Sequence, residues 1–366
     1  MLILLILLIC YSVFLSWLIF ILLVNKPARN FNRSSLPVSI VIPFRNEQDH
    51  LNTLLLSLQD QSYCGSFEVL LINDGSTDQS VEVIRNFQKH SKIMISLLDS
   101  TYNPERKLTS KQQALDFGIN HTRHDWIALT DADMKLHPDW LNLLMNSTKD
   151  NPALVFGHTS LVTDNTLFNK IQAFQLDFLF SAAFAFFKAG ITGSCMGNNM
   201  LISKQAYLKA GGQKAIGFNI AEDRALLNLF RKKNSVISCT DPFKPLALTF
   251  PCNSWKQFFH QFCRWAKGGF VWRSTLFLIG ILFSIQNLLL LSSICLILPP
   301  LLSSVAIGNF ILTWLFTAAS FRRIFSDQKF HFFPFFFLFL LFETIFFFFS
   351  ILFRFDIEWK GRKLNH

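Results

Sequence analysis

Two closely spaced acidic pairs are the residues of this sequence whose types and spacing could do chemistry. Asp131 and Asp133 follow the apolar run at 126–130, and Glu222 and Asp223 precede a run typical of a helix. An apolar run bounded by polar residues indicates a buried strand, and open α/β sheets bind ligands at the carboxyl ends of such strands. Alternate residues of an extended segment point the same way, so we expect Asp131 and Asp133 to face one site.

Two carboxylates at a strand end can bind a hard divalent cation that carries a nucleotide diphosphate. A bare Asp-x-Asp is also common as a solvated acidic turn. In the same way, Glu222 and Asp223 taken alone could simply be acidic residues that favour a helix N-terminus. The rest of the chain has to decide between these alternatives.

The elements that must position these pairs begin before them in the chain. The β-branched run at 38–43 predicts a strand, and residues 50–58 predict an amphipathic helix. Residues 67–72 predict a second strand, which ends at the polar loop 73–78 before a helix that begins near Gln79. This alternation predicts an α/β domain with a Rossmann-like, doubly wound and mostly parallel sheet.

Apolar segments at both ends of the chain predict a membrane protein. Of the 366 residues, 51% are hydrophobic and only 16% are charged, and residues 2–24 form an uncharged stretch long enough to span a bilayer. No positive residue precedes this stretch and no small-residue cleavage site follows it, so an uncleaved anchor fits better than a secretory signal. Further spans are predicted at about 275–298, 300–320 and 332–353.

The net charge of +10 could indicate a nucleic-acid partner. However, the sequence has no basic helix pattern with interleaved aromatic residues, so we expect no nucleic-acid partner. Much of the excess flanks the apolar segments, at Lys26, Arg29, Arg33, Arg322 and Arg323. This pattern places the middle domain in the cytosol, at the cell inner membrane and against its anionic lipids. The seven cysteines show no paired metal-ligand spacing and are interpreted as reduced, structural residues.

Four regions are therefore predicted: a transmembrane anchor at 1–24, a cytosolic domain at 36–272, about three transmembrane segments at 275–353, and a basic tail at 354–366. Three crossings after a cytosolic domain would put the tail outside, although its basic residues prefer the inside. One segment could therefore be re-entrant. Glu343, within the last segment, is either an acceptor contact or a packed glutamate.

Two stretches of the middle domain, near 166–191 and 255–272, are predicted to be interfacial helices. A membrane crossing at 166–191 would put Asp133 and Asp223 on opposite sides of the membrane, where they could not share a substrate. We therefore expect an interfacial or core helix there, at the entrance for a lipid acceptor.

Four motifs in the first half of the chain give a specific resemblance. In order, they are Pro43-Phe44-Arg45-Asn46-Glu47, Asn73-Asp74-Gly75-Ser76-Thr77-Asp78, Lys111 with Ala114, Leu115 and Gly118, and Asp131-Ala132-Asp133. The series resembles the nucleotide-sugar half of a family 2 glycosyltransferase with the GT-A fold. The resemblance implies a donor site that includes Pro43, Arg45, Glu47, Asp74 and Asp131. It further implies Lys107 or Lys111 near the diphosphate, and Asp133, with Asp131, as ligands of Mg²⁺ or Mn²⁺.

The second half of the chain continues this resemblance. The small-residue loop at 193–199 is a plausible acceptor contact through Gly193 and Asn198. In the family, an aspartate of the Glu222-Asp223 pair takes the proton of the acceptor hydroxyl, a reaction that needs such a base. Adjacent carboxylates can raise one another's pKa toward a useful range.

Gln261-Phe262-Cys263-Arg264-Trp265 resembles the Gln-x-x-Arg-Trp motif of membrane-integrated members. Gln261 and Arg264 would lie on the donor side, where a guanidinium can pair with diphosphate oxygens. Trp265 would offer an apolar face to donor or acceptor. The same residues also suit a helix end at the level of the lipid headgroups.

The resulting hypothesis is an inverting glycosyltransferase that moves a sugar from a nucleotide-diphosphate donor, expected to be a UDP-sugar, to a hydroxyl of a membrane lipid. The arrangement is similar to ceramide and hopanoid glucosyltransferases. A processive polysaccharide synthase is the alternative within the enzyme class, and a membrane scaffold without chemistry is the alternative outside it. Asn73, in place of a frequent aspartate, and Phe44-Arg45, in place of a frequent tyrosine, leave base and sugar specificity open.

Overall fold

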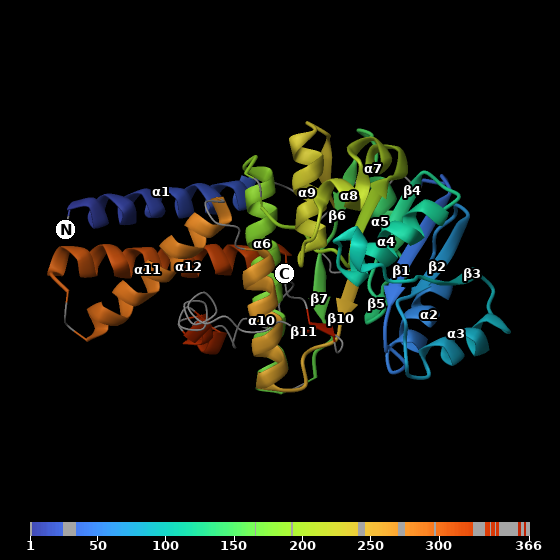
Figure 1. Ribbon diagram of the computed structural model, residues 1–366. Helices are drawn as coiled ribbons and strands as arrows, with labels where there is room; N and C mark the ends of the chain where they lie inside the picture. Colours follow the sequence, from blue (N-terminus) through green and yellow to red (C-terminus); the bar gives the residue numbers. More distant parts are fainter. Residues whose placement is uncertain are drawn as a thin grey trace. The chain divides into compact units, whose positions relative to one another are not determined.

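The computed structural model (Figure 1) describes a chain of two compact units, each assembled from separated stretches of sequence. We call residues 1–27, 163–193 and 252–355 the helical unit, and residues 28–162, 194–251 and 356–366 the sheet unit. The residues described are 2–24, 34–164, 166–191, 193–240, 246–269, 275–295, 298–324, 334–336, 338–340, 342–343, 358–359 and 362–363.

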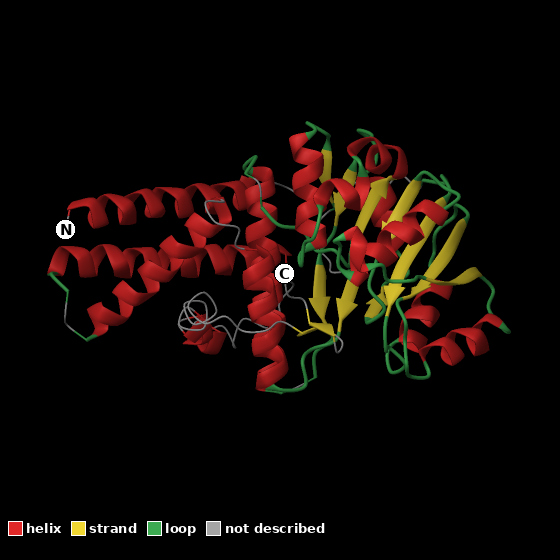
Figure 2. Ribbon diagram, viewed as in Figure 1, coloured by secondary structure: helices red, strands yellow, loops and turns green. Residues whose placement is uncertain are grey.

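The sheet unit is built on a mixed seven-stranded sheet within the described residues (Figure 2), with the order β3-β2-β1-β4-β8-β6-β9. Its strands are β1 (Val38–Phe44), β2 (Phe67–Asn73), β3 (Met94–Asp99), β4 (Trp126–Leu129), β6 (Leu154–Phe156), β8 (Met200–Ser203) and β9 (Ile237–Cys239). Strands β3, β2, β1 and β4 are parallel to one another, and β8 is antiparallel to both β4 and β6. The predicted doubly wound, mostly parallel sheet is confirmed.

A second, smaller sheet joins β5 (Met134–Leu136), β10 (Ala247–Thr249) and β7 (Thr159–Leu161). Strand β10 is antiparallel to β5 and parallel to β7. The chain passes from β4 of the large sheet into β5 of the small one through residues 130–133 alone. The short strands β11 (Glu358–Trp359) and β12 (Arg362–Lys363) form an antiparallel pair.

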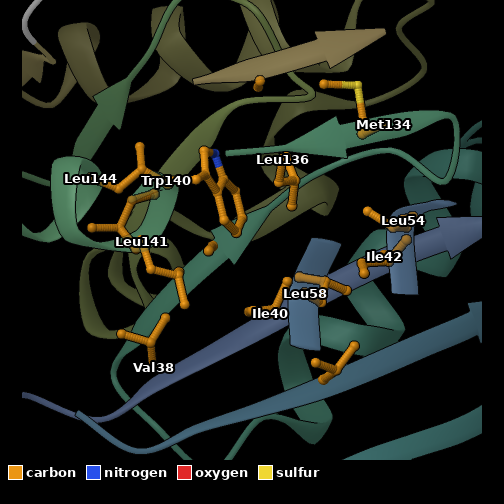
Figure 3. Close-up of a cluster of buried hydrophobic side chains, with 14 of the residues drawn as sticks. Val38, Ile40, Ile42, Leu54, Leu58, Met134, Leu136, Trp140, Leu141 and Leu144 are labelled. Carbon is orange, nitrogen blue, oxygen red and sulfur yellow. The ribbon is translucent and has the colours of Figure 1, made fainter. Parts of the chain in front are cut away.

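Helices cover both faces of the large sheet because its central strands are apolar on both sides. Ile40 and Ile42 belong to the core cluster that includes Leu54 of α2, whereas Val41 and Ile72 lie against Gly118 of α4. Figure 3 shows the first of these faces, with the α2 side chains over β1. The helices of this unit are α2 (Leu51–Gln59), α3 (Ser80–Gln88), η1 (Pro104–Arg106), α4 (Ser110–His121), α5 (Trp140–Asn146), α7 (Lys204–Ala210), α8 (Gly212–Ile216) and α9 (Glu222–Lys232).

The helical unit consists of α1 (Leu2–Val24), α6 (Leu167–Lys188), α10 (Trp255–Gly269), α11 (Thr275–Ile294) and α12 (Pro300–Ile324) in its described part. Three helices there are long and apolar enough to cross a membrane, over Leu2–Val24, Phe277–Ile294 and Pro300–Ser320. They correspond to the first three predicted spans. Most of the fourth predicted span, 332–353, lies outside the described residues.

A buried polar network connects α1, α11 and α12. The Asn309 amide donates to the Leu8 carbonyl at 3.1 Å and to Gln286 Oε1 at 3.2 Å, and it accepts from the Ser12 hydroxyl at 2.6 Å. Gln286 in turn donates to the Ala306 carbonyl at 2.6 Å. These neutral groups satisfy one another away from water, which is how polar side chains join helices in apolar surroundings.

The backbone from Asp131 to Asp133 is not extended as expected. Residues 132 and 133 form a turn, and β4 already ends at Leu129. The rule that alternate residues share a side holds for extended backbone and not across a turn. Asp131 and Asp133 have different side-chain partners, Lys111 and Thr249, as described next.

Candidate active site

A capping box at the start of α4 places a lysine in the first turn of that helix. The Thr109 hydroxyl accepts from the Gln112 backbone N–H at 3.1 Å, and Gln112 Oε1 accepts from the Thr109 N–H at 3.0 Å. These reciprocal bonds satisfy donors that a helix N-terminus otherwise leaves free. They fix the backbone around Lys111.

The Lys111 ammonium bridges the two acidic pairs. Its Nζ lies 2.9 Å from Asp131 Oδ1, which follows β4, and 2.9 Å from Glu222 Oε1, which begins α9. Burial alone would disfavour the charged lysine, but the two carboxylates outweigh it and raise the pKa of Lys111. Asp131 and Glu222, which are 91 residues apart in the chain, thus pair with the same cation.

Asp223 lies beside this bridge with a different set of partners. Its Oδ2 accepts from the Gly197 backbone N–H at 3.0 Å, and its Oδ1 accepts from the Arg224 N–H at 2.7 Å. Burial and, next, the neighbouring Glu222 carboxylate raise the pKa of Asp223 to about 6, despite these two hydrogen bonds and Lys111. A carboxylate tuned in this direction suits general-base chemistry near neutral pH.

These charged groups line a cavity of about 340 Å³, a volume that includes the open solvent at its mouth. Apolar side chains form part of its wall, and polar groups converge on it from four separate segments. The lining residues are Lys111, Leu115, Leu129, Thr130, Asp131, Gly197, Met200, Gln213, Glu222, Asp223 and Leu226. Polar groups that converge on one cavity beside apolar side chains are a usual feature of small-ligand sites.

Gly197 makes the close approach to Asp223 possible. A Cβ at this position would lie 2.7 Å from the Asp223 Cβ and 3.1 Å from its Oδ2. The small-residue loop predicted to approach a ligand thus approaches the carboxylate of Asp223. Asn198, the predicted acceptor contact, accepts through Oδ1 from the Thr159 hydroxyl at 2.9 Å.

The residues predicted for the nucleotide end gather where β1 and β2 end. Pro43 is in β1, and Arg45 follows it and donates from Nη1 to the Asp74 carbonyl at 2.9 Å. The Asp74 side chain is 2% exposed. The Glu47 backbone N–H donates to the Ser80 hydroxyl at 2.8 Å, which ties the first polar loop to the second.

The two candidate diphosphate lysines differ in their surroundings. Lys107 is exposed, in left-handed backbone (φ 50°) after η1, whereas Lys111 is held between two carboxylates. Lys107 is thus open to solvent. Lys111 is better described as the group that holds Asp131 and Glu222 together.

Asp133 is a carboxylate that could bind a metal ion, but further ligands would have to complete the coordination shell. Its Oδ2 accepts from the Thr249 hydroxyl at 3.4 Å, and no group of three His, Cys, Asp or Glu side chains within the described residues could hold a metal ion. Mg²⁺ and similar hard cations commonly take one or two carboxylates and complete their shell with water and substrate phosphates. The carboxylates that follow β4 fit such a shared site.

The remaining predicted residues belong to the helical unit. Gln261, Arg264 and Trp265 lie on α10, where Gln261 Oε1 accepts a hydrogen bond from the Cys252 thiol at 3.6 Å. Gly193 follows α6, and a Cβ added at this position would lie 3.3 Å from the Cβ of Phe186. Their roles toward donor and acceptor stay predictions.

Sequence reasoning did not single out Thr130, Gln213 or Gln112. Thr130 lines the cavity, and its buried hydroxyl has no hydrogen-bond partner in the part of the chain that the structure describes. No motif marks Gln213, because its place in the cavity depends on α8. The only available signal for Gln112 was its capping position three residues after Thr109.

A profile of glycosyl transferase family 21 matches residues 1–365 of the chain. The chain belongs to glycosyl transferase family 21. The predicted resemblance to family 2-like glycosyltransferases is thereby confirmed. A family 21 chain with this sheet and these helices also agrees with the predicted fold class.

Curated relatives of this family 21 chain cover part of it. It is 32% identical over 116 residues to the undecaprenyl-phosphate 4-deoxy-4-formamido-L-arabinose transferase of Edwardsiella ictaluri, covering 30% of this chain and 33% of that protein. It is 26% identical over 224 residues to the 4,4'-diaponeurosporenoate glycosyltransferase of Staphylococcus aureus, covering 58% of this chain and 56% of that protein. The chain thus spans about a third to somewhat over half of these relatives.

A solved structure supports the fold of the family 21 chain over nearly its whole length. The mannosyltransferase PcManGT from Pyrobaculum calidifontis, in complex with GDP-Man and Mn²⁺, aligns with a TM-score of 0.57 at 14% identity. The alignment covers 95% of this chain and 98% of that one. This likeness identifies a GT-A-type fold.

Proposed function

We propose that this protein is an inverting glycosyltransferase that transfers a sugar from a nucleotide-diphosphate donor to a hydroxyl of a membrane lipid. The observation that carries the proposal is the meeting of Lys111, Asp131, Glu222 and Asp223 in one cavity of a family 21 chain. The cavity holds a carboxylate of raised pKa beside a charge-paired cluster, as acid–base chemistry requires.

In this mechanism Asp223 removes the proton from the acceptor hydroxyl as its oxygen attacks the anomeric carbon. The bond from that carbon to the diphosphate oxygen breaks in the same step, and the nucleoside diphosphate leaves. Glu222 pairs with Lys111, and its charge, after burial, helps to raise the pKa of Asp223. The single displacement inverts the anomeric centre.

The donor is proposed to bind across the ends of β1, β2 and β4. Asp74, Arg45, Glu47 and Pro43 would hold its nucleoside, expected to be uridine, and Lys107 would pair with the diphosphate. Asp133, with Asp131 as second ligand, would hold Mg²⁺ or Mn²⁺, whose charge when bound stabilises the leaving diphosphate. The mannosyltransferase of similar fold was solved with GDP-Man and Mn²⁺, which supports a nucleotide-sugar donor and a divalent metal.

A lipid acceptor fits the apolar helices and the names of the relatives. Three helices in the described part of the chain could cross a membrane, and the two relatives are named for undecaprenyl phosphate and 4,4'-diaponeurosporenoate. We propose that the protein is integral to the cell inner membrane with the sheet unit in the cytosol. Gln261, Arg264 and Trp265 of α10, with Gly193 and Asn198, would contribute at the membrane side of donor and acceptor.

Membranes that contain the protein would test this function with a panel of labelled UDP- and GDP-sugars, with and without EDTA. We expect EDTA-sensitive label in the organic-extractable fraction, and its loss in Asp223→Asn. Label found only in high-mass polymer would favour a polysaccharide synthase instead. No transfer from any donor, with nucleotide binding intact, would reject the enzyme and favour the scaffold.

A further inference from the structure

Gln112 is a buried amide whose entire hydrogen-bonding capacity is used. Its side chain is 0% exposed, and Nε2 donates to Gln213 Oε1 at 3.0 Å and to the Gly217 carbonyl at 2.8 Å. Its Oε1 accepts from the backbone N–H of Thr109 at 3.0 Å and of Asn219 at 3.1 Å. An amide has two donors and an acceptor oxygen with two lone pairs, so each is engaged.

Three of these four partners lie in one segment that leads directly to the acidic pair. Gln213 is in α8, and Gly217 and Asn219 lie in the connection between α8 and α9. Asp223, the proposed base, follows Asn219 by four residues. The neighbouring Lys111 reaches the same region through Glu222, at 2.9 Å. Two consecutive residues of α4 therefore bind this region: Gln112 binds α8 and the connection, and Lys111 binds the first residue of α9.

At Gly217 and Ala221 the connection has no side chain of its own that could accept a hydrogen bond. Gly217 has φ +72°, with open space where a Cβ would be, and the N-cap of α9 is Ala221, whose methyl group cannot accept a hydrogen bond. The Asn219 side chain does accept from the Ala221 N–H at 2.9 Å. That bond ties the end of the connection to Asn219, and Gln112 ties Asn219 to α4.

We propose that Gln112 is a positioning residue: its four hydrogen bonds fix the 213–221 segment on α4 and so hold the Asp223 carboxylate at the reacting atoms. The structural part of this role rests on the four hydrogen bonds. Its effect on catalysis rests on the proposed function, in which Asp223 is the base. Misplacement of a reacting group by about 1 Å can cost about 100-fold in rate. Gln112 touches no substrate in this scheme and acts through the segment.

Gln113 offers a matched control in the next position of the same helix. It is also buried, at 3% exposed, and donates to the Asn103 and Leu108 carbonyls at 2.7 and 3.3 Å while accepting from the Asn103 N–H at 2.9 Å. Its bonds hold the loop before α4, on the donor side. Gln112→Met and Gln113→Met thus remove similar bonds from similar surroundings but release different segments.

The experiment measures kcat and the donor KM for the wild type and both variants in membranes. We expect Gln112→Met to lower kcat by about 10- to 100-fold with the donor KM within about threefold of the wild type. Gln113→Met should keep kcat within about twofold. Equal losses of kcat in the two variants, or an unchanged kcat in Gln112→Met, would overturn the inference while leaving the glycosyltransferase activity established.

Gly217→Ala provides a second route if either methionine variant fails to accumulate. The substitution strains the positive φ of the segment, but a methyl group there meets nothing within 4 Å. A lowered kcat with an unchanged donor KM supports the positioning role. An unchanged kcat counts against it.

Hydrogen–deuterium exchange of the same proteins tests the structural claim without any turnover. We expect the amides of 217–224 to exchange at least about tenfold faster in Gln112→Met than in the wild type or Gln113→Met. Equal exchange in all three, or faster exchange spread evenly over the sheet, would refute a local positioning role. If the wild type transferred no sugar, the proposed function would fall, and this measurement would still decide the inference.

Discussion

The two units of this chain bury polar clusters of different kinds: a neutral one in the helical unit and a charged one in the sheet unit. In the helical unit, Asn309, Gln286 and Ser12 are neutral and satisfy one another across three helices. In the sheet unit, Asp223 shares a cavity with Glu222, and the negative charge of Glu222 opposes the ionisation of Asp223. A satisfied neutral network stabilises a fold, whereas an imperfectly compensated charge is available for chemistry.

The difference lies in how the partners were assembled. The Asn309 amide bonds to three neutral groups on α1 and α11, so no charge has to be compensated there. Lys111 forms ion pairs with two carboxylates, whereas the hydrogen bonds of Asp223 come from two backbone N–H groups. Burial and, next, the charge of Glu222 keep the pKa of Asp223 near 6, although Lys111 lowers it.

The largest effect is expected from Asp223→Asn, which removes the base but keeps its shape. Transfer should fall by about 10²- to 10⁴-fold, the usual range for a general base. The folded protein should be at least as stable at pH 7, because the raised pKa means that ionising Asp223 costs free energy in the folded state. Initial rates and thermal unfolding at pH 7 measure the two effects.

Glu222→Gln is the control for this prediction. It removes a charge from the same turn of α9 and relieves the repulsion that raises the pKa of Asp223. Its loss of activity should be clearly smaller. Equal losses in the two variants would mean that Asp223 has no special role as the base.

Lys111→Met is expected to be next, with a loss of about 100-fold in kcat at pH 7, because two carboxylates lose their common cation. Lys111 lowers the pKa of Asp223, so its removal should move the acid limb of the pH–rate profile to higher pH. Lys107→Met serves as the control and should change the donor KM without moving that limb. A profile that stays in place in Lys111→Met would contradict the shared-cation description.

The pH dependence of the wild type gives a third, smaller effect. Only ionised Asp223 can accept a proton, so kcat should fall as pH drops through about 6. It should be lower by about tenfold at pH 5 than at its plateau. A flat profile between pH 5 and 8 would exclude Asp223 as a base whose ionisation limits the rate.

The smallest effect is expected from the neutral network. Asn309→Leu should lower the stability of the protein in detergent by about 1 kcal/mol, because α1, α11 and α12 lose shared hydrogen bonds. Activity per folded molecule should change by less than about twofold. Ser292→Ala is the control, since that exposed hydroxyl bonds only to the Leu288 carbonyl of its own helix.

Much of the architecture followed from the sequence because local patterns carry it. The β-branched runs gave β1 and β2, the apolar run before Asp131 gave β4, and the uncharged stretches gave the three helices that could span a membrane. The motifs indicated the family, and the predicted candidates Lys111, Asp131, Glu222 and Asp223 share one cavity. Such signals depend on neighbours within a few residues, so a sequence displays them.

Only the tertiary structure decided how these residues are paired. A turn at 132–133 separates Asp131 from Asp133, and Lys111 joins Asp131 to Glu222 rather than standing free for a phosphate. The importance of Gln112 follows from bonds to residues about 100 positions away. The sequence determined which groups are present and which elements carry them. Their partners, and hence the pKa of Asp223, depend on contacts that exist only once the sheet and helices have packed.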